Sequence, residues 1–273
     1  MSNSEALISG RFFPASVLMW SRPVSEFLEA VARRGFRGAE VWAQHLQRSS
    51  ESARDVRRRA DELGLELTTH AVSYDLNPLS QNVEVREVSR RQILQSLLDA
   101  ATMRARVVIV HPGHLSSGTD DPEDYWPDLL DLCAVLDERA ALLGLKVGIE
   151  GMERKVNHFF IEPATLNRLA SAMESSGWAQ LGLTVDMAHL ATFTDPLEAF
   201  RKIDRIVHVH ISDGKPPQAT HRPMGMGVLP IREMLKAALG RGVQTIAIEG
   251  RWREDEELAL DRAAGELAGL DVR

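Results

Sequence analysis

Short apolar runs that resemble β-strands alternate with amphipathic helical stretches along most of the chain, and this alternation restricts the fold more than any other feature. The eight strand-like runs cover residues 16–20, 38–43, 65–70, 107–111, 146–150, 181–186, 206–212 and 245–249. Between several of them, apolar residues recur at the three- and four-residue spacing of helices. Eight strand–helix units in about 250 residues predict an α/β protein with a (β/α)8 barrel.

Glycines and prolines mark the predicted helix ends. Gly64 and Gly144 each follow a helical pattern and precede an apolar residue, which is typical of a left-handed helix C-cap before a strand. Pro122 and Pro196 stand where first helical turns should begin. No change in composition divides the chain, so we expect one barrel domain over residues 1–273. An open, doubly wound sheet is the alternative, but a glycine-rich phosphate loop does not follow the first run.

Composition restricts the partners and the compartment. The net charge of −7 makes nucleic acid an unexpected partner, because phosphate binding normally requires a basic surplus. A single cysteine, Cys133, excludes an intramolecular disulfide. Neither a signal peptide nor an apolar run of membrane-spanning length is visible. We expect a cytoplasmic protein that does not enter membranes, with a homo-oligomer left open.

Residues that bind metals or move protons stand at or near the ends of six runs. In a (β/α)8 barrel, the active site forms where the carboxyl ends of the strands meet. The six residues are His70, His111, Glu150, Asp186, His210 and Glu249. Burying such groups without partners is costly, and a divalent cation among them removes that cost. The pattern therefore predicts a metal centre at the mouth of the barrel.

The run "IVHVHIS" places two histidines on one face of a strand, because strand side chains alternate. His208 and His210 should both point into the barrel, with His210 nearer the mouth and His208 a structural group. Ser212 and Asp213 should then begin a loop. Glu40 lies within run 38–43, and the sequence leaves it either as a partner of an active-site residue or as a member of a buried ion pair.

The types of ligand suggest which metals bind. Three carboxylates and one imidazole, from Glu150, Asp186, His210 and Glu249, suit Mn²⁺, Mg²⁺ or Co²⁺. Four more candidate ligands are His70, His111, His189 and His221. Together they exceed the needs of one ion, and the added imidazoles favour Zn²⁺ or Mn²⁺. We expect one divalent ion, Mn²⁺ or Zn²⁺ before Co²⁺ or Mg²⁺, with ligands enough for a second.

Several motifs occur in order at successive run ends: "THAVSYDLNP", "VVIVHPGH", "VGIEG", "LTVDMAH", "HVHISDG", "HRPMGMG" and "IAIEG". In this order the chain resembles the xylose isomerase-like barrel superfamily, which contains sugar isomerases and epimerases and also endonuclease IV. The resemblance extends over about residues 17–250.

The resemblance to epimerases implies a metal-dependent isomerase or epimerase of a sugar or sugar phosphate. Glu150, Asp186, His210 and Glu249 match the metal ligands of that group. Glu150 and Glu249 also match its proton-transfer pair, which acts through a metal-bound enediolate, and His189 matches a substrate contact. An arginine common after the histidine of the seventh strand is absent here, where Lys215 is the nearby cation.

Further substrate contacts come from residues near the run ends. Trp20 and Trp42 close the first two runs and could form an apolar wall for a sugar, although core packing explains them equally well. Arg251 follows the last run and could hold a phosphate.

The resemblance to endonuclease IV implies an alternative, a two-metal phosphodiesterase or other hydrolase. Eight of the nine zinc ligands in that pattern are matched, by His70, His111, Glu150, Asp186, His189, His210, His221 and Glu249. Ala219 stands where the ninth, an aspartate, should be. That loss and the acidic net charge count against a DNA repair nuclease.

Overall fold

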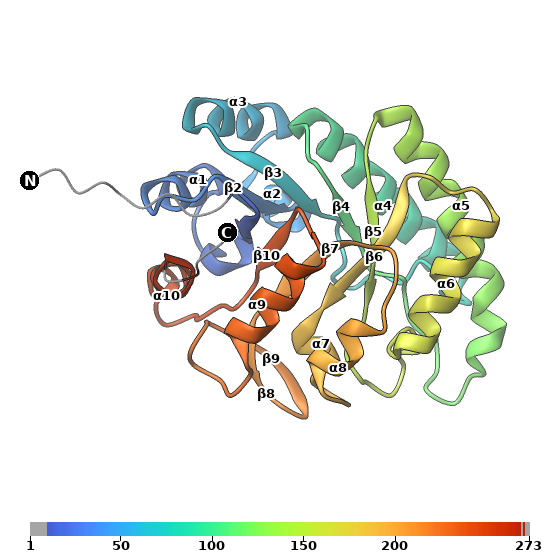
Figure 1. The fold of residues 1–273 in the computed structure, drawn as a ribbon. Helices are drawn as coiled ribbons and strands as arrows, with labels where there is room; N and C mark the ends of the chain where they lie inside the picture. Colours follow the sequence, from blue (N-terminus) through green and yellow to red (C-terminus); the bar gives the residue numbers. More distant parts are fainter. Residues whose placement is uncertain (1–9, 269, 271–273) are drawn as a thin grey trace, which may run out of the picture.

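Eight parallel strands form a nearly closed barrel in the computed structural model, which describes residues 10–268 and 270 except for the Ala219 side chain (Figure 1). The strands are β1 Phe12–Pro14, β2 Gly38–Trp42, β3 Glu66–His70, β4 Val108–Val110, β5 Val147–Gly151, β6 Leu181–Asp186, β7 Ile206–Ile211 and β10 Ile246–Ile248. Their order in the sheet is β1-β10-β7-β6-β5-β4-β3-β2. A parallel bridge between Ala15 and Glu40 brings the two ends of the sheet together.

This arrangement confirms the predicted (β/α)8 barrel and contradicts the open sheet. The predicted domain limits at residues 1 and 273 lie outside the described residues.

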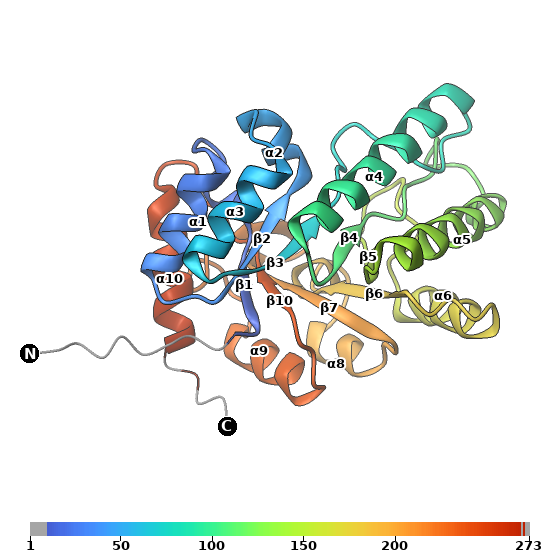
Figure 2. The ribbon, with the colours of Figure 1, turned by 90° about the horizontal axis from the view of Figure 1, so that it is seen from above.

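Helices surround the strands on the outside of the barrel (Figure 2). They are α1 Val24–Arg33, α2 Ala43–Ser49, α3 Ala53–Leu63, α4 Val83–Met103, α5 Trp126–Leu143, α6 Pro163–Ser175, α8 Pro196–Arg201, α9 Ile231–Gly240 and α10 Glu256–Ala268. The short α7 Met187–Leu190 instead follows β6 directly, and all of its residues are buried. Two 3₁₀ helices, η1 Ser16–Met19 and η2 Pro122–Tyr125, lie among them. The predicted C-caps are confirmed, since Gly64 and Gly144 end α3 and α5 with φ of 67° and 68°.

Helix α1 illustrates how the outer layer packs. Val24, Phe27, Leu28 and Val31 follow the helical period and are fully buried. Burying each such side chain contributes about 1.5–3 kcal/mol to stability. The same helix carries Glu26 in its first turn and Arg33 in its last, where each charge complements the helix dipole.

The predicted first strand, residues 16–20, is wrong. The first strand is Phe12–Pro14, and Ser16–Met19 forms one buried 3₁₀ turn. A short apolar run is compatible with either structure, so its periodicity does not distinguish them. The ladder to β10 continues only to Ala15, whose N–H donates to Ile248 O at 2.9 Å. Trp20 therefore follows a 3₁₀ turn and does not close a strand.

The predicted loop at Ser212 and Asp213 is wrong at Asp213, because an antiparallel hairpin begins there, whereas Ser212 lies between β7 and the hairpin. Its strands are β8 Asp213–Lys215 and β9 Gln218–Arg222. The Asp213 carboxylate accepts hydrogen bonds from the N–H groups of Gly214, Gly227 and Leu229 at 2.8–3.0 Å. These bonds attach the following loop to the hairpin, which brings His221 to the mouth of the barrel.

Candidate metal centre

Four predicted ligands converge at one end of the barrel: Glu150, Asp186, His210 and Glu249. Each offers one ligand atom, and these atoms all lie within 4.8 Å of one another. Nδ1 of His210 lies 3.1 Å from Glu150 Oε1 and 3.2 Å from Glu249 Oε2. The four residues come from β5, β6, β7 and the position after β10, which are consecutive in the sheet. We call them the primary group.

The primary group fits a divalent cation. Asp186 Oδ2 and Glu249 Oε1 are buried without a hydrogen-bond partner among the described residues. Asp186 uses its other oxygen to cap α7, accepting from Ala188 N at 2.7 Å and His189 N at 3.0 Å. A buried carboxylate oxygen without a donor is costly, and a cation between these oxygens would satisfy both. Three carboxylates and one imidazole suit Mn²⁺, Mg²⁺, Co²⁺ or Zn²⁺.

The histidine and the carboxylates of the primary group shift one another's pKa values. Burial alone would lower the pKa of His210, but the surrounding Glu249, Glu150 and Glu40 hold it well above its usual value. Burial alone would raise the pKa of Glu150 and of Glu249, but His210 keeps both below their usual value. Both glutamates are therefore ionised near neutral pH.

A second group contains His70, His111 and Glu150. Glu150 Oε2 lies 3.4 Å from His70 Nε2 and 3.1 Å from His111 Nε2. Nδ1 of His70 lies 2.7 Å from Ala71 O, so the protonated Nδ1 donates there and Nε2 is left to bind a metal. Glu150 thus presents one oxygen to each group and could serve as a ligand in both.

A third group contains Asp186, His189 and His221. Asp186 Oδ2 lies 3.6 Å from His189 Nε2 and 3.8 Å from His221 Nδ1. Burial alone would lower the pKa of His189, but Asp186, Glu150 and Glu153 raise it to about 9. The structure thus brings all eight predicted metal ligands to one end of the barrel.

A cavity of about 580 Å³ opens above these groups. Trp42 and Arg251, two of the predicted substrate contacts, line it. Trp20 instead packs edge-on against Trp42, with ring centroids 6.4 Å apart. Lys215 is exposed at the end of β8, outside the cavity lining.

The sequence did not point to Glu153, Lys155 or Tyr74, which also line the cavity. Glu153 forms ion pairs with Lys155 and, at 3.6 Å, with His189 Nε2. Burial alone would raise the pKa of Glu153, but His189 and Lys155 lower it to about 2. Its position, two residues after β5, was the available signal, since loops after strands form the mouth of such barrels.

Among the described residues, the helices are too short or too polar to cross a membrane.

The curated proteins that are similar to the chain in sequence include an uncharacterized protein and a dehydratase. An uncharacterized protein of Methanocaldococcus jannaschii is 26% identical over 245 residues, which cover 85% of this chain and 80% of that protein. A 3-dehydroshikimate dehydratase of Pseudomonas aeruginosa is 29% identical over 171 residues, which cover 62% of this chain. The matched region spans only 25% of the dehydratase.

Solved structures share the fold at low sequence identity. A D-tagatose 3-epimerase-like protein has a TM-score of 0.80 and 24% identity, with 94% of this chain and 96% of that chain covered. The 3-keto-D-glucoside 4-epimerase of E. coli, in its apo form, has a TM-score of 0.77 and 20% identity, with 95% and 99% covered. The sequence profile of xylose isomerase-like TIM barrels matches residues 28–270. The family profile, the related proteins and the barrel fold all agree with the motifs at the strand ends. The chain therefore belongs to the xylose isomerase-like TIM barrel family.

Proposed function

We propose that the protein is a divalent-metal-dependent isomerase or epimerase of a sugar or sugar phosphate. The observation that carries the proposal is the pair Glu150 and Glu249, two buried carboxylates that both lie beside Nδ1 of His210 and line the cavity of about 580 Å³. The names of similar folds, a D-tagatose 3-epimerase-like protein and a 3-keto-D-glucoside 4-epimerase, support the same class of reaction.

The two glutamates would transfer a proton between faces of one carbon. A divalent ion held by the primary group would act as a Lewis acid that acidifies the C–H next to a carbonyl. One glutamate accepts that proton, and the substrate becomes an enediolate. The other carboxyl group, which first takes up a proton from solvent, donates that proton to the opposite face, which inverts the centre, or to the neighbouring carbon, which moves the carbonyl. General acid–base catalysis of this kind contributes about 10²–10⁴-fold to the rate.

Other residues would hold the substrate. The Trp42 ring lies on His70, with centroids 4.0 Å apart, and offers an apolar surface to one face of a sugar. His189 and Arg251 line the same cavity and offer hydrogen-bond donors to hydroxyl or phosphate oxygens. Trp20 would support Trp42 from the side, and Lys215 would stay at the surface of the hairpin.

Solvent exchange tests this function. Ketoses, inosose-like polyols and their phosphates are incubated with the protein in D₂O and followed by NMR. At least one compound should gain deuterium next to its carbonyl. Glu249→Gln should lower the exchange by about 10²-fold or more. Because Glu249 is also a predicted ligand, rates are compared per bound ion, and Glu162→Gln, a change at an exposed glutamate, is the control.

A second candidate is a two-metal phosphodiesterase, in which water attacks phosphorus. The two further ligand groups favour it, because a single-ion reaction has no need of His70, His111, His189 and His221 together. An abasic-site duplex and simple phosphodiesters are therefore assayed in parallel. Their cleavage by the wild-type protein, with no deuterium uptake in any sugar, would replace the isomerase by the hydrolase.

A further inference from the structure

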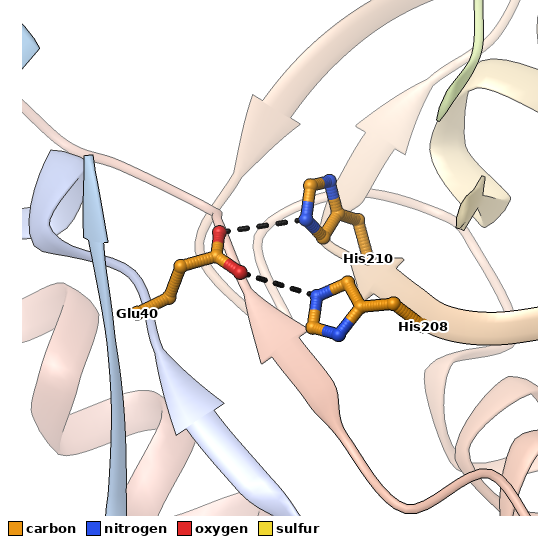
Figure 3. Close-up of side chains that lie close together, drawn as sticks. All are labelled: Glu40, His208 and His210. Atoms are coloured by element: carbon orange, nitrogen blue, oxygen red, sulfur yellow. Dashed lines mark ion pairs between the residues drawn. The ribbon is translucent and has the colours of Figure 1, made fainter. Parts of the chain in front are cut away.

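A buried carboxylate, Glu40, lies inside the barrel against the histidine of the primary group (Figure 3). Glu40 Oε1 is 3.4 Å from His210 Nε2, and Glu40 Oε2 is 3.1 Å from His208 Nε2. All three residues are fully buried. Glu40 comes from β2 and the histidines from β7, two strands that are not neighbours in the sheet, so the contact crosses the barrel interior.

His210 faces carboxylates with both ring nitrogens. Its Nδ1 points to Glu150 and Glu249, and its Nε2 points to Glu40. In a neutral imidazole one nitrogen carries the proton and only the other can bind a metal. The group that pairs with one ring nitrogen of His210 therefore determines which of the two nitrogens is free to bind a metal.

We propose that Glu40 is a positioning residue for His210: it accepts the Nε2–H and so directs the lone pair of Nδ1 to the metal. This role rests on the proposed metal centre. Partners of this kind behind a metal-binding histidine fix its tautomer and orientation, and their loss typically costs 10–100-fold in metal affinity.

The surroundings of Glu40 hold its two oxygens in separate roles. Thr68 Oγ1 donates to Oε2 at 3.0 Å. His208 Nε2 lies beside the same oxygen, while Nδ1 of His208 pairs with Thr245 Oγ1 at 2.7 Å. Oε2 thus has two neighbours of its own, and Oε1 is left for His210. This assigns His208, which the sequence marked as structural, to orienting Glu40.

The variant Glu40→Gln tests the role, because it preserves shape and removes the charge. The oxygen of the new amide should stay with its donor, Thr68, and beside His208. Its NH₂ group would then face His210 Nε2, which favours the tautomer with the proton on Nδ1. We expect the affinity of the primary group for Co²⁺, measured by competition with a chelator, to fall by about 10–100-fold.

A spectroscopic measurement separates positioning from a general loss of structure. In the Zn²⁺-loaded wild type, ¹⁵N NMR of the histidines should show His210 protonated on Nε2 and without a proton on Nδ1. In Glu40→Gln that pattern should be lost or populated only at higher Zn²⁺ concentration. Glu66→Gln is the matched control, since Glu66 is exposed and paired with Arg106, and it should change neither measurement. If Glu40→Gln does not fold, Thr68→Val is measured instead. This variant removes one donor to Oε2. It should weaken Co²⁺ binding, but by less than the about 10–100-fold expected for Glu40→Gln.

The outcomes distinguish this role from its alternatives. Unchanged affinity and an unchanged His210 tautomer in Glu40→Gln would overturn the role and leave Glu40 as an ion-pair partner of His208. Loss of one ion per chain, with the primary ion intact, would also overturn it, because the Glu40, His208 and His210 cluster would then hold its own metal. A wild-type protein that takes up no divalent ion would refute the metal centre itself, and the role of Glu40 with it.

Discussion

Glu150 is the residue on which the proposed chemistry depends most. Its Oε1 lies in the primary group beside His210, and its Oε2 lies beside His70 and His111. One side chain is therefore a candidate proton carrier, a ligand of one ion and a ligand of a second. Because these roles share one carboxylate, replacing Glu150 cannot separate them, and the second group has to be tested at its histidines.

His111 tests whether a second ion binds. His111→Ala should reduce the number of ions per chain, while the ion at the primary group remains, because the lost ligand belongs only to the second group. Elemental analysis of the purified protein measures this number. His114→Ala is the matched control, as His114 lines the same cavity outside these groups. Equal metal content in wild type and His111→Ala would make His70 and His111 substrate contacts or structural groups.

His45 gives a pH-dependent contribution to stability that is separate from the metal centre. Its Nε2–H donates to Arg22 O at 2.7 Å, while burial lowers its pKa below the usual value. The unfolded chain then binds a proton more readily than the folded one, so this contribution is present above pH about 6.5 and declines as the pH falls. His45→Gln can keep the donor and does not titrate. Urea unfolding at pH 7.5 and 5.5 should show the wild type losing more stability than the variant, and equal losses would contradict this account.

At the scale of single elements, strand β5 requires a glycine to bring Glu150 to the mouth. Gly148 lies two positions before Glu150 and pairs with Gly182 of β6. A Cβ at Gly148 would lie 2.1 Å from Thr184 Oγ1 and 3.3 Å from Val207 Cγ2. The barrel interior below the site therefore has no room for a methyl group at Gly148, because the side chain of Thr184 has little freedom to rotate away.

Gly148→Ala should destabilise the protein by about 1–3 kcal/mol through overpacking. Thr184→Ala should partly relieve that cost, because the nearest clashing atom is removed. Urea unfolding of the two single variants and the double variant measures the coupling as a double-mutant cycle. A double variant whose loss of stability equals the sum of the two single losses would show that the contact does not limit packing.

At the scale of the whole molecule, the first and last units of the barrel are joined. Glu256 at the start of α10 accepts hydrogen bonds from Ser21 N at 2.9 Å and Ser21 Oγ at 2.6 Å. Arg34, after α1, donates to Asp261 in α10 at 2.7 Å. A metal in the primary group would add a further connection, since its ligands come from β5, β6, β7 and the end of β10.

Metal removal should therefore lower the melting temperature. An ion present at 100 times its Kd stabilises the folded state by about 2.7 kcal/mol. For a chain of this size that corresponds to a shift of roughly 5–10 °C, which calorimetry with and without EDTA measures. Asp186→Asn should lose most of the shift, because asparagine still caps α7 and removes a charged ligand. A wild type whose melting temperature responds neither to EDTA nor to added Mn²⁺, Co²⁺ or Zn²⁺ would contradict the metal centre.

Local patterns in the sequence determined the barrel and its reactive end. Strand and helix periods depend on neighbouring residues, and parallel strands of a barrel bring their carboxyl ends together. The sequence alone therefore predicts that one site contains Glu150, Asp186, His210 and Glu249. Helix ends at Gly64 and Gly144 were predictable for the same reason, because a left-handed C-cap is a local preference of glycine.

The remaining features depend on contacts that form only in the folded chain. The apolar pattern of residues 16–20 predicts a strand, but Ser16–Met19 forms a 3₁₀ turn. A short apolar run can be buried at the closing edge of the barrel in either conformation. Glu40 was ambiguous because its partners lie on β7, far along the chain and across the barrel. Contacts between distant segments depend on how the sheet closes, and the local spacing of apolar residues in a single sequence does not predict that closure.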